Sequence, residues 1–287
     1  MALTVNTNTA AINALTNYQH TNRSLNSSFQ KISSGLRITK AADDAAGLAV
    51  AENLDAQSQS LRQAKRNIND GISVIQTAEG GANEVANILK RMRELSVEAS
   101  SETLNSTERG YIRTEMDSAF SEIDRIGQIL EFNGITLGVK SAAAAVTAPN
   151  ALDVQVGIDN TSNDRITVSL LHIKARQGLG IGDTQINNFE ISTTTDFGNY
   201  LSTLDRAIDT VNTYRAKYGA TQNRLSSALN NLEVYTENVD SAQSQIRDAD
   251  FAHETAEMAK FQIMAQAGTS VLAQANQINQ GALRLLG

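Results

Sequence analysis

The two ends of the chain carry long rows of residues at heptad spacing, and these rows constrain the fold more than any other feature. Read inward from the N-terminus, the first row runs through Leu15, Tyr18, Asn22, Leu25, Phe29, Ile32 and Leu36. Read inward from the C-terminus, the second row runs through Leu285, Ala282, Ile278, Ala275, Val271, Ala267, Ile263, Ala259 and Ala256. Residues at this spacing lie along one side of an α-helix, and such a row needs a partner that buries it. The pattern predicts a chain that folds back so that its termini lie side by side.

The composition favours long helices with thin apolar seams over a thick core. Only 5% of the 287 residues are aromatic, tryptophan is absent, and Pro149 is the single proline. The net charge of −7 argues against nucleic acid as a partner, because basic patches would be expected for that role. The lack of cysteine excludes disulfides and thiol chemistry. No stretch approaches the roughly 20 apolar residues of a membrane span, and the N-terminal residues do not resemble a cleaved signal, so we expect no membrane insertion.

Five helices are expected. The first covers about residues 4–36, and the second begins near Ala45 after a cap at Asp43 or Asp44 and continues for about 55 residues. A third follows a polar break at 100–107, a fourth of about 50 residues begins near residue 195, and the last follows Asp248 and Asp250. The seam of the second helix is the strictest: Leu54, Leu61, Ile68, Ile75, Val85, Ile88, Met92, Leu95 and Ala99.

Between the third and fourth helices the apolar period changes to two. Apolar residues alternate with polar ones over 152–158 and again over 166–170, with the loop 159–164 between them. This alternation predicts a β-hairpin with one apolar face. The expected fold class is therefore mainly α: a long antiparallel helical rod or coiled-coil bundle with a small β-hairpin in the middle of the chain.

The sequence offers no catalytic, cofactor-binding or metal-binding constellation. The run from His253 to Glu257 begins like the helical zinc-protease motif but has Glu257 where that motif requires its second histidine. The glycines at 178–182 lack the spacing and the strand–helix context of a phosphate loop. We therefore expect a protein that is not an enzyme and has no cofactor.

The terminal helices leave two possibilities open. They could form an ordinary intramolecular coiled coil, or their rows could be completed by other copies of the same chain. About 50 Å of apolar row on each helix is more than the hairpin can cover, and little else in the chain is left to pack on it. Interfaces repeated head to tail without closure produce a filament.

Motifs near both ends carry a specific resemblance. They are SSGLRI at 33–38, DDAAGL at 43–48, NINDGIS at 67–73, REL at 93–95, FNG at 132–134, SQIRDADFA at 244–252 and QAGTSVLAQAN at 266–276. In this order and at these positions the chain resembles the bacterial flagellins, the filament subunits of the flagellum. The resemblance covers nearly all of the chain outside about 140–195, which leaves room only for a near-minimal form without large outer domains.

The resemblance implies two domains and a set of partners. Residues 1–44 with 247–287 would form the filament core, and 45–246, including the hairpin segment 140–195, would form a surrounding helical shell. The subunit would polymerise with itself, alone or together with other flagellins. It would be exported by the flagellar type III system with a chaperone on its C-terminal segment, meet the hook-associated junction and cap proteins, and reside in the extracellular filament.

Two sets of site residues follow. For the polymerisation interface we expect Leu25, Phe29, Ile32, Leu36, Ile263, Val271, Ile278 and Leu285. A second patch matches the surface that a vertebrate Toll-like flagellin receptor reads and that subunits also use between themselves: Arg91, Arg93, Glu94, Leu95 and Glu115. Lys90, Met92 and Ser96 depart from the commonest form of that pattern.

Three alternatives predict different behaviour. A hook–filament junction protein shares the terminal helices but acts in few copies. An enzyme displayed on a filament would need an inserted catalytic domain, for which the middle segment is too short. A coiled-coil adaptor that does not polymerise would form a stable dimer instead of long filaments.

Overall fold

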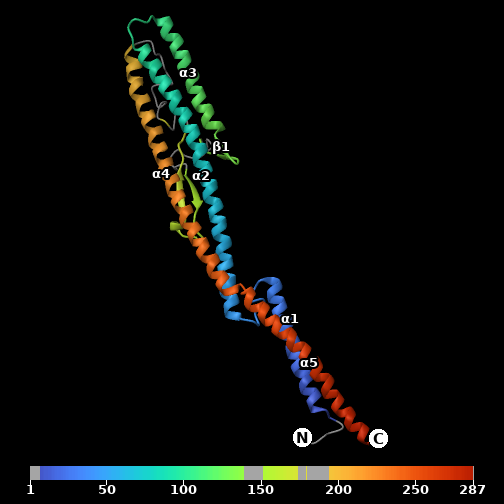
Figure 1. Ribbon diagram of the computed structural model, residues 1–287. Helices are drawn as coiled ribbons and strands as arrows, with labels where there is room; N and C mark the ends of the chain where they lie inside the picture. Colours follow the sequence, from blue (N-terminus) through green and yellow to red (C-terminus); the bar gives the residue numbers. More distant parts are fainter. Residues whose placement is uncertain (1–6, 139–150, 174–178, 180–193, 287) are drawn as a thin grey trace. The chain divides into compact units, whose positions relative to one another are not determined.

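The protein is mainly α-helical with a small β-hairpin, as the sequence predicts (Figure 1). The computed structural model describes residues 7–138, 151–173, 179 and 194–286, with the backbone alone at 194–199 and 278–286. The helices of these residues are α1 (Thr9–Ser34), α2 (Ala45–Ala99), α3 (Ser106–Ile129), α4 (Thr194–Arg247) and α5 (Phe251–Leu286). The strands are β1 (Glu131–Phe132), β2 (Ile135–Thr136), β3 (Ala151–Gln155) and β4 (Arg165–Ser169), with a short 3-10 turn η1 (Ser162–Asp164) before β4.

The chain divides into two compact units. The terminal unit consists of residues 1–58 and 237–287, and the central unit consists of residues 59–236. Helices α2 and α4 each contribute to both units. The proposed boundaries of a filament core and a shell, near residues 44 and 247, remain a prediction.

Polar side chains and one glycine set the helix ends. The Asn8 side chain accepts a hydrogen bond from the Ala11 amide at 3.0 Å, and α1 ends where Gly35 takes a left-handed conformation with φ 72°. The described part of α1 is therefore shorter at both ends than the predicted helix, and Leu36 lies outside it. Asp44 caps α2 by accepting from the Gly47 amide at 2.8 Å, as predicted.

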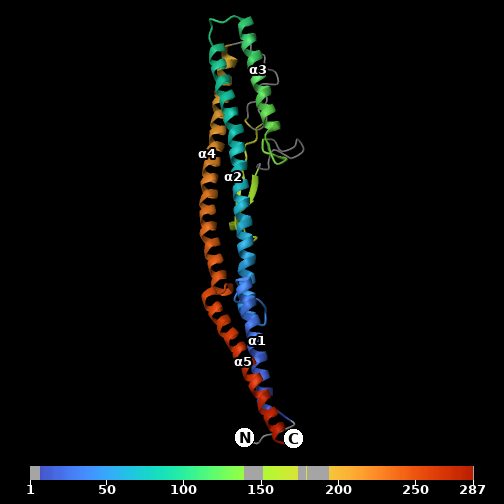
Figure 2. The ribbon, with the colours of Figure 1, turned by 45° about the vertical axis from the view of Figure 1, so that its right-hand side comes forward.

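The central unit has a continuous apolar core between α2, α3 and α4, which run side by side (Figures 1 and 2). The predicted seam of α2 is confirmed, because its residues in this unit are buried or half-buried. From α3 and α4 the core receives Ile112, Met116, Ile123, Leu204, Val211, Tyr218, Leu225 and Leu232. Burying such side chains contributes about 1.5–3 kcal/mol each, so this unit has the means to fold by itself.

The predicted hairpin is formed by β3 and β4. The strands are antiparallel, with Leu152 opposite Val168 and Val154 opposite Ile166. Three of these four side chains are buried, and Leu152 is half-buried. Beyond β4, the Leu171 amide donates a hydrogen bond of 2.7 Å to the Tyr218 hydroxyl, which ties the hairpin to α4.

The terminal unit is built differently. Helices α1 and α5 run antiparallel and side by side (Figures 1 and 2). The Asn8 side chain donates to the Ala275 carbonyl at 3.0 Å near one end, and Lys31 pairs with Glu254 near the other. In the described side chains of these two helices, the buried positions are Thr21, Ser28, Glu254 and Ala275, and no large apolar side chain is buried. The pair therefore lacks a core of its own.

Candidate assembly surfaces

The N-terminal row is split between two faces of α1. Tyr18, Leu25 and Ile32 are half-buried toward α5. Leu15 and Phe29, from the same predicted row, are 46% and 64% exposed. The positions that are fully buried are instead Thr21 and Ser28, one residue before Asn22 and Phe29. Leu15 and Phe29, two of the seven residues of the predicted row, are thus left for another partner.

Most of the described C-terminal row faces away from α1, and Ala275 is the exception. Ile263 is 67% exposed and Val271 is 52% exposed. The alanines at 256, 259 and 267 are exposed as well. The row that is buried or half-buried toward α1 consists of Glu254, Met258, Phe261, Ala265, Gly268, Leu272 and Ala275. The chain does fold back as predicted, but α5 packs on α1 with a different row from the predicted one, in which Met258, Phe261 and Leu272 are half-buried among small and polar residues.

The large apolar side chains that point to solvent from the two helices form what we term the exposed apolar set. Its members are Ile12, Leu15, Phe29, Phe251, Ile263, Met264 and Val271. Exposed apolar surface of this kind marks interaction sites in soluble proteins. Sequence reasoning included Phe29, Ile263 and Val271 in the interface but missed Ile12, Phe251 and Met264, which lie outside the rows. The side chains of Ile278 and Leu285 lie outside the described residues.

Residues 35–37, which follow α1, are hydrogen-bonded to residues 247–249, which precede α5, and we term this junction the root. Leu36 pairs with Asp248 in an antiparallel bridge. The Arg37 amide donates to the Arg247 carbonyl at 2.7 Å, and the Ala249 amide donates to the Gly35 carbonyl at 2.9 Å. The Leu36 side chain is half-buried beside this bridge, and its role in the polymerisation interface stays a prediction.

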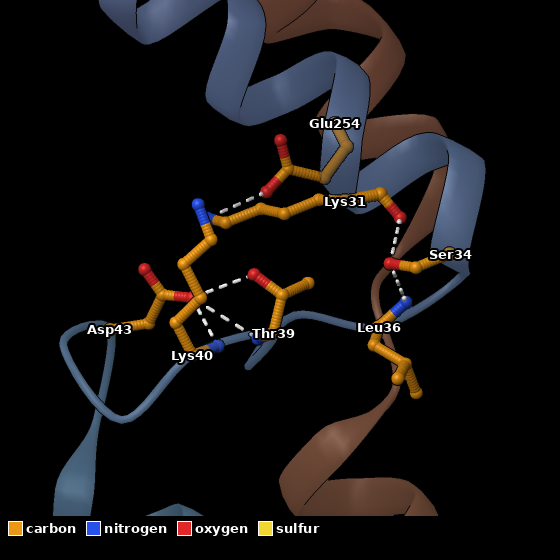
Figure 3. A network of polar contacts seen from close by, with 7 residues as sticks. All are labelled: Lys31, Ser34, Leu36, Thr39, Lys40, Asp43 and Glu254. Atoms are coloured by element: carbon orange, nitrogen blue, oxygen red, sulfur yellow. Dashed lines mark hydrogen bonds and ion pairs between the residues drawn. The ribbon is translucent and has the colours of Figure 1, made fainter.

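A polar network surrounds the root (Figure 3). The Lys31 ammonium lies 3.2 Å from the Glu254 carboxylate, which links the last turn of α1 to the first turn of α5. In the loop before α2, the Asp43 carboxylate accepts from the Thr39 hydroxyl at 2.9 Å and from the Thr39 and Lys40 amides at 3.1 and 3.0 Å. These hydrogen bonds, that of the Thr39 hydroxyl foremost, lower the pKa of Asp43, with a smaller contribution from the Lys31 charge. The loop is thereby held as a compact turn.

The second predicted patch lies on the central unit and is only partly assembled. The Arg91 guanidinium lies 2.9 Å from the Glu115 carboxylate and 3.4 Å from that of Glu94, and all three side chains are at least half exposed. The hydrogen bond with Glu115 raises the pKa of Arg91. Leu95 is buried in the core, as predicted for a seam residue, and Arg93 turns toward α4, where it pairs with Asp205 at 2.6 Å. Arg91 contacts both Glu94 and Glu115, and we term these three residues the exposed patch. Arg93, whose side chain is also 46% exposed, pairs with Asp205 instead.

Within the described residues, no group of three histidine, aspartate or glutamate side chains could hold a metal ion. None of the helices there is long and apolar enough to cross a membrane. The surfaces that the chain does present are suited to contact with other proteins.

Comparison with known proteins identifies the family to which the chain belongs. The bacterial flagellin N-terminal helical region matches residues 5–138, and the bacterial flagellin C-terminal helical region matches residues 201–286. The chain belongs to the bacterial flagellin family. It is 38% identical to the flagellar filament 33 kDa core protein of Treponema phagedenis and 38% identical to the flagellin of Bacillus subtilis (strain 168). Each match covers 98% of this chain and 99% of the relative.

Each match covers nearly the whole of this chain and nearly the whole of the relative. This chain is therefore a compact member of the family, as its sequence predicts. A solved structure described as that of a flagellar hook-associated protein from Vibrio parahaemolyticus shares the fold, with a TM-score of 0.59 and 18% identity over 72% of this chain and all of that one. A flagellin is a structural protein, not an enzyme. This chain is a subunit that polymerises with itself into the extracellular filament of the flagellum.

Proposed function

We propose that the α1–α5 pair, within residues 1–44 and 247–287, forms the core of the filament and that residues 45–246 form the shell around it. The observation that carries this proposal is the exposure of Phe29 and Ile263 on two helices whose shared face, in its described part, fully buries no large apolar side chain. The central unit, in contrast, already buries its seam. Large apolar side chains that still need a partner are thus concentrated on the terminal helices.

The energetics support assembly as the step that orders these helices. Fixing the backbone costs about 1–2 kcal/mol per residue, and the α1–α5 contact buries no large apolar side chain in its described part to offset this. Covering an exposed phenylalanine or isoleucine contributes about 1.5–3 kcal/mol. Contacts of the exposed apolar set with neighbouring subunits supply the missing stabilisation.

The same surface suggests the partners that come before and beside the filament. The outward row of α5 is an amphipathic surface of the kind that binds in the groove of a helper protein. An export chaperone would cover this row before passage through the flagellar type III system. The hook-associated junction and cap proteins would meet the same helices at the two ends of the filament.

The exposed patch of Arg91, Glu94 and Glu115 is proposed as a second contact between subunits. Its charged groups are reachable, because the side chain of Arg91 is 56% exposed and that of Glu115 is 50% exposed. A vertebrate Toll-like flagellin receptor would read the patch on free subunits. Leu95 supports it from the core, and Arg93 lies beside it in its pair with Asp205.

Substitution of the exposed apolar set tests the proposal. Phe29→Ala and Ile263→Ala should leave the melting of the monomer unchanged and abolish long filaments in salt-induced assembly, observed by electron microscopy. Ile123→Ala is the matched control with the opposite pattern. It removes a fully buried side chain of the central unit and should destabilise the monomer by about 2–5 kcal/mol.

Two results would contradict the proposal. Normal filaments from the Phe29 and Ile263 variants, with earlier melting of their monomers, would mean that the terminal helices pack within one chain and would favour the dimeric adaptor. Parent protein that forms only short assemblies of few copies would favour the junction protein.

A further inference from the structure

Helix α1 carries two heptad seams that lie side by side on its surface. The inner seam faces α5, and all of its residues are buried or half-buried: Ala11, Ala14, Tyr18, Thr21, Leu25, Ser28 and Ile32. The outer seam is displaced from the inner one by a single residue and runs through Ile12, Leu15, Gln19, Asn22, Asn26 and Phe29. Both seams keep alternating steps of three and four residues, the spacing at which helices pack in coiled coils. The row predicted from the sequence takes alternate members of the two.

The outer seam is not covered by α5. One residue turns an α-helix by about 100°, so the outer seam points to the side of the α1–α5 contact. Its three apolar side chains, those of Ile12, Leu15 and Phe29, are between 46% and 64% exposed. A heptad seam with exposed apolar side chains needs a further helix to bury it. Helix α1 is therefore suited to pack against two helices, of which α5 of the same chain is one.

The second helix comes from another copy of the chain. The protein polymerises into a filament, and a filament requires interfaces that join two different surfaces of neighbouring copies. If the outer seam paired with the same seam of a neighbour, the two-fold contact would close on a dimer. The complementary surface is instead the exposed side of α5, because it presents the apolar side chains of Ile263, Met264 and Val271.

Polar residues interrupt the outer seam in its middle. Ile12 and Leu15 stand at one end and Phe29 at the other, and the turns between them hold Gln19, Asn22 and Asn26. The exposed side of α5 also has amides, at Gln262, Gln266 and Gln274. A side-chain amide both donates and accepts hydrogen bonds, so amides on facing helices can pair when a contact buries them. An amide that is buried against an apolar side chain leaves those hydrogen bonds unmade, at a cost in free energy.

We propose that the outer seam of α1 binds the exposed side of α5 of a neighbouring copy, and that Gln19, Asn22 and Asn26 fix the register of this contact. Seams that are apolar throughout allow two helices to slide by a heptad, whereas a buried asparagine selects one alignment at some cost in stability. In a polymer this alignment sets the stagger between subunits, and a regular lattice needs the same stagger in every copy. The inference rests on the proposed function, because it concerns the helices of the filament core.

Leucine substitution of the three amides tests the register. The triple variant Gln19→Leu/Asn22→Leu/Asn26→Leu makes the outer seam apolar throughout. Because a buried leucine needs no polar partner, the critical concentration for assembly should fall by about tenfold, which corresponds to about 1.4 kcal/mol. Cryo-electron microscopy should show more helical lattices than the parent forms under the same conditions. An unchanged critical concentration, an unchanged lattice or a loss of assembly would each overturn the inference.

The matched control adds three leucines elsewhere on α1. Asn13, His20 and Ser27 are exposed and recur every seven residues, on a face that is turned roughly 130° away from each seam. The variant Asn13→Leu/His20→Leu/Ser27→Leu should keep the critical concentration and the lattice of the parent. Equal changes in the control would assign the effect to general hydrophobicity and count against the inference. Circular dichroism and protease resistance of the central unit verify that every variant is folded.

Disulfide crosslinking identifies the partner helix, since the chain has no cysteine of its own. Gln19→Cys is mixed in turn with chains that carry a single cysteine at one exposed position of α5: Ala252, Ala256, Ala259, Gln266, Ser270 or Gln274. Any disulfide between the two variants joins different chains. In oxidised filaments Gln19→Cys should link to one α5 position or to two adjacent ones, and the links should spread over more positions when Asn22→Leu and Asn26→Leu are added. Links between two Gln19→Cys chains, or no link to α5, would overturn the inference.

The proposed function is judged separately by Phe29→Ala. Normal assembly of that variant would contradict the proposed core of the filament. Blocked assembly of Phe29→Ala, together with a triple leucine variant that behaves like the parent, would contradict the register alone.

Discussion

Gly71 of α2 lies directly against Val154 of β3. A Cβ atom on Gly71 would come within 2.9 Å of one Val154 methyl carbon and 3.1 Å of the other. Gly80, two and a half turns further along the same helix, has nothing within 4 Å of that position. Glycine inside a helix costs up to about 1 kcal/mol relative to alanine, so on sequence alone both residues are expected to weaken α2. In the structure, Gly71 allows the hairpin to approach, whereas Gly80 has no packing role.

Alanine substitutions at these two glycines should therefore act in opposite directions. Gly71→Ala should destabilise the monomer by about 1–3 kcal/mol, since valine has little rotamer freedom with which to relieve the clash. Gly80→Ala should stabilise it by about 0.5–1 kcal/mol, because alanine favours the helix. Urea denaturation of both monomers measures the difference. Equal shifts of the same sign would show that the close approach of the hairpin to α2 is not needed.

The Tyr218 hydroxyl is the acceptor for a buried amide. Tyr218→Phe leaves the Leu171 N–H without its partner, and an unsatisfied buried donor costs about 1–3 kcal/mol. We expect a loss of that size in the free energy of unfolding of the monomer, together with faster hydrogen exchange at Leu171. Tyr214→Phe is the control, because no hydrogen bond to a buried amide depends on its hydroxyl in the described structure. Equal losses for the two variants would assign the effect to ring packing.

Alkaline pH should weaken the central unit through the same residue. Burial, above all, raises the pKa of Tyr218 to about 12, whereas the pKa of an unfolded tyrosine is about 10. Between these values the folded protein keeps a proton that the unfolded chain releases. The contribution to stability is therefore complete below about pH 10 and is lost as the pH rises through about 12. The free energy of unfolding, measured by urea from pH 9 to 12, should fall less steeply in Tyr218→Phe than in the parent. Tyr111→Phe, at a side chain that is 72% exposed, should not change the slope.

The helices of the central unit and their packed faces could be predicted from the sequence, because each seam residue serves only to pack against the other helices of that unit. Leu61, Ile68 and Ile75 recur every seven residues, and the helices they pack against belong to the same unit. The hairpin, the cap at Asp44 and the break at Asp248 and Asp250 before α5 could be predicted as well, because each depends on neighbours in sequence. These features follow from local chemistry and from a single apolar face.

The sequence predicts that the terminal segments are helices, but it does not predict which faces of these helices contact each other. Periodicity identifies an apolar row such as the one through Ile263 and does not say whether that row faces the same chain or another. Here the buried positions of α1 are Thr21 and Ser28, and Gly268 of α5 packs against Tyr18; these three polar or small residues carry no apolar signal. The ion pair of Lys31 with Glu254 joins residues 223 positions apart, and no local pattern reveals it.

Limited proteolysis should separate the two kinds of helix. In the monomer, the segments at about 1–42 and 250–287 should be removed rapidly and leave a core near 45–245, because the α1–α5 pair has little buried apolar surface to offset its ordering entropy. In filaments the same segments should resist digestion. Mass spectrometry of the fragments identifies the cut sites. Equal protection of the ends in monomer and filament would contradict assembly-coupled folding.

Loss of Arg91 should weaken two contacts at once if the exposed patch serves both. Truncating one partner of a charged contact that becomes desolvated costs about 2–5 kcal/mol, which is enough to damage assembly. Arg91→Ala should thus reduce swimming motility and filament length, and it should lower receptor activation by the free subunit in a reporter-cell assay. Arg125→Ala removes an equally exposed arginine that pairs with Glu122 on its own helix, and it should leave all three readouts unchanged. Full motility and undiminished receptor activation in Arg91→Ala would reduce the patch to a solvated face, where an exposed ion pair contributes little.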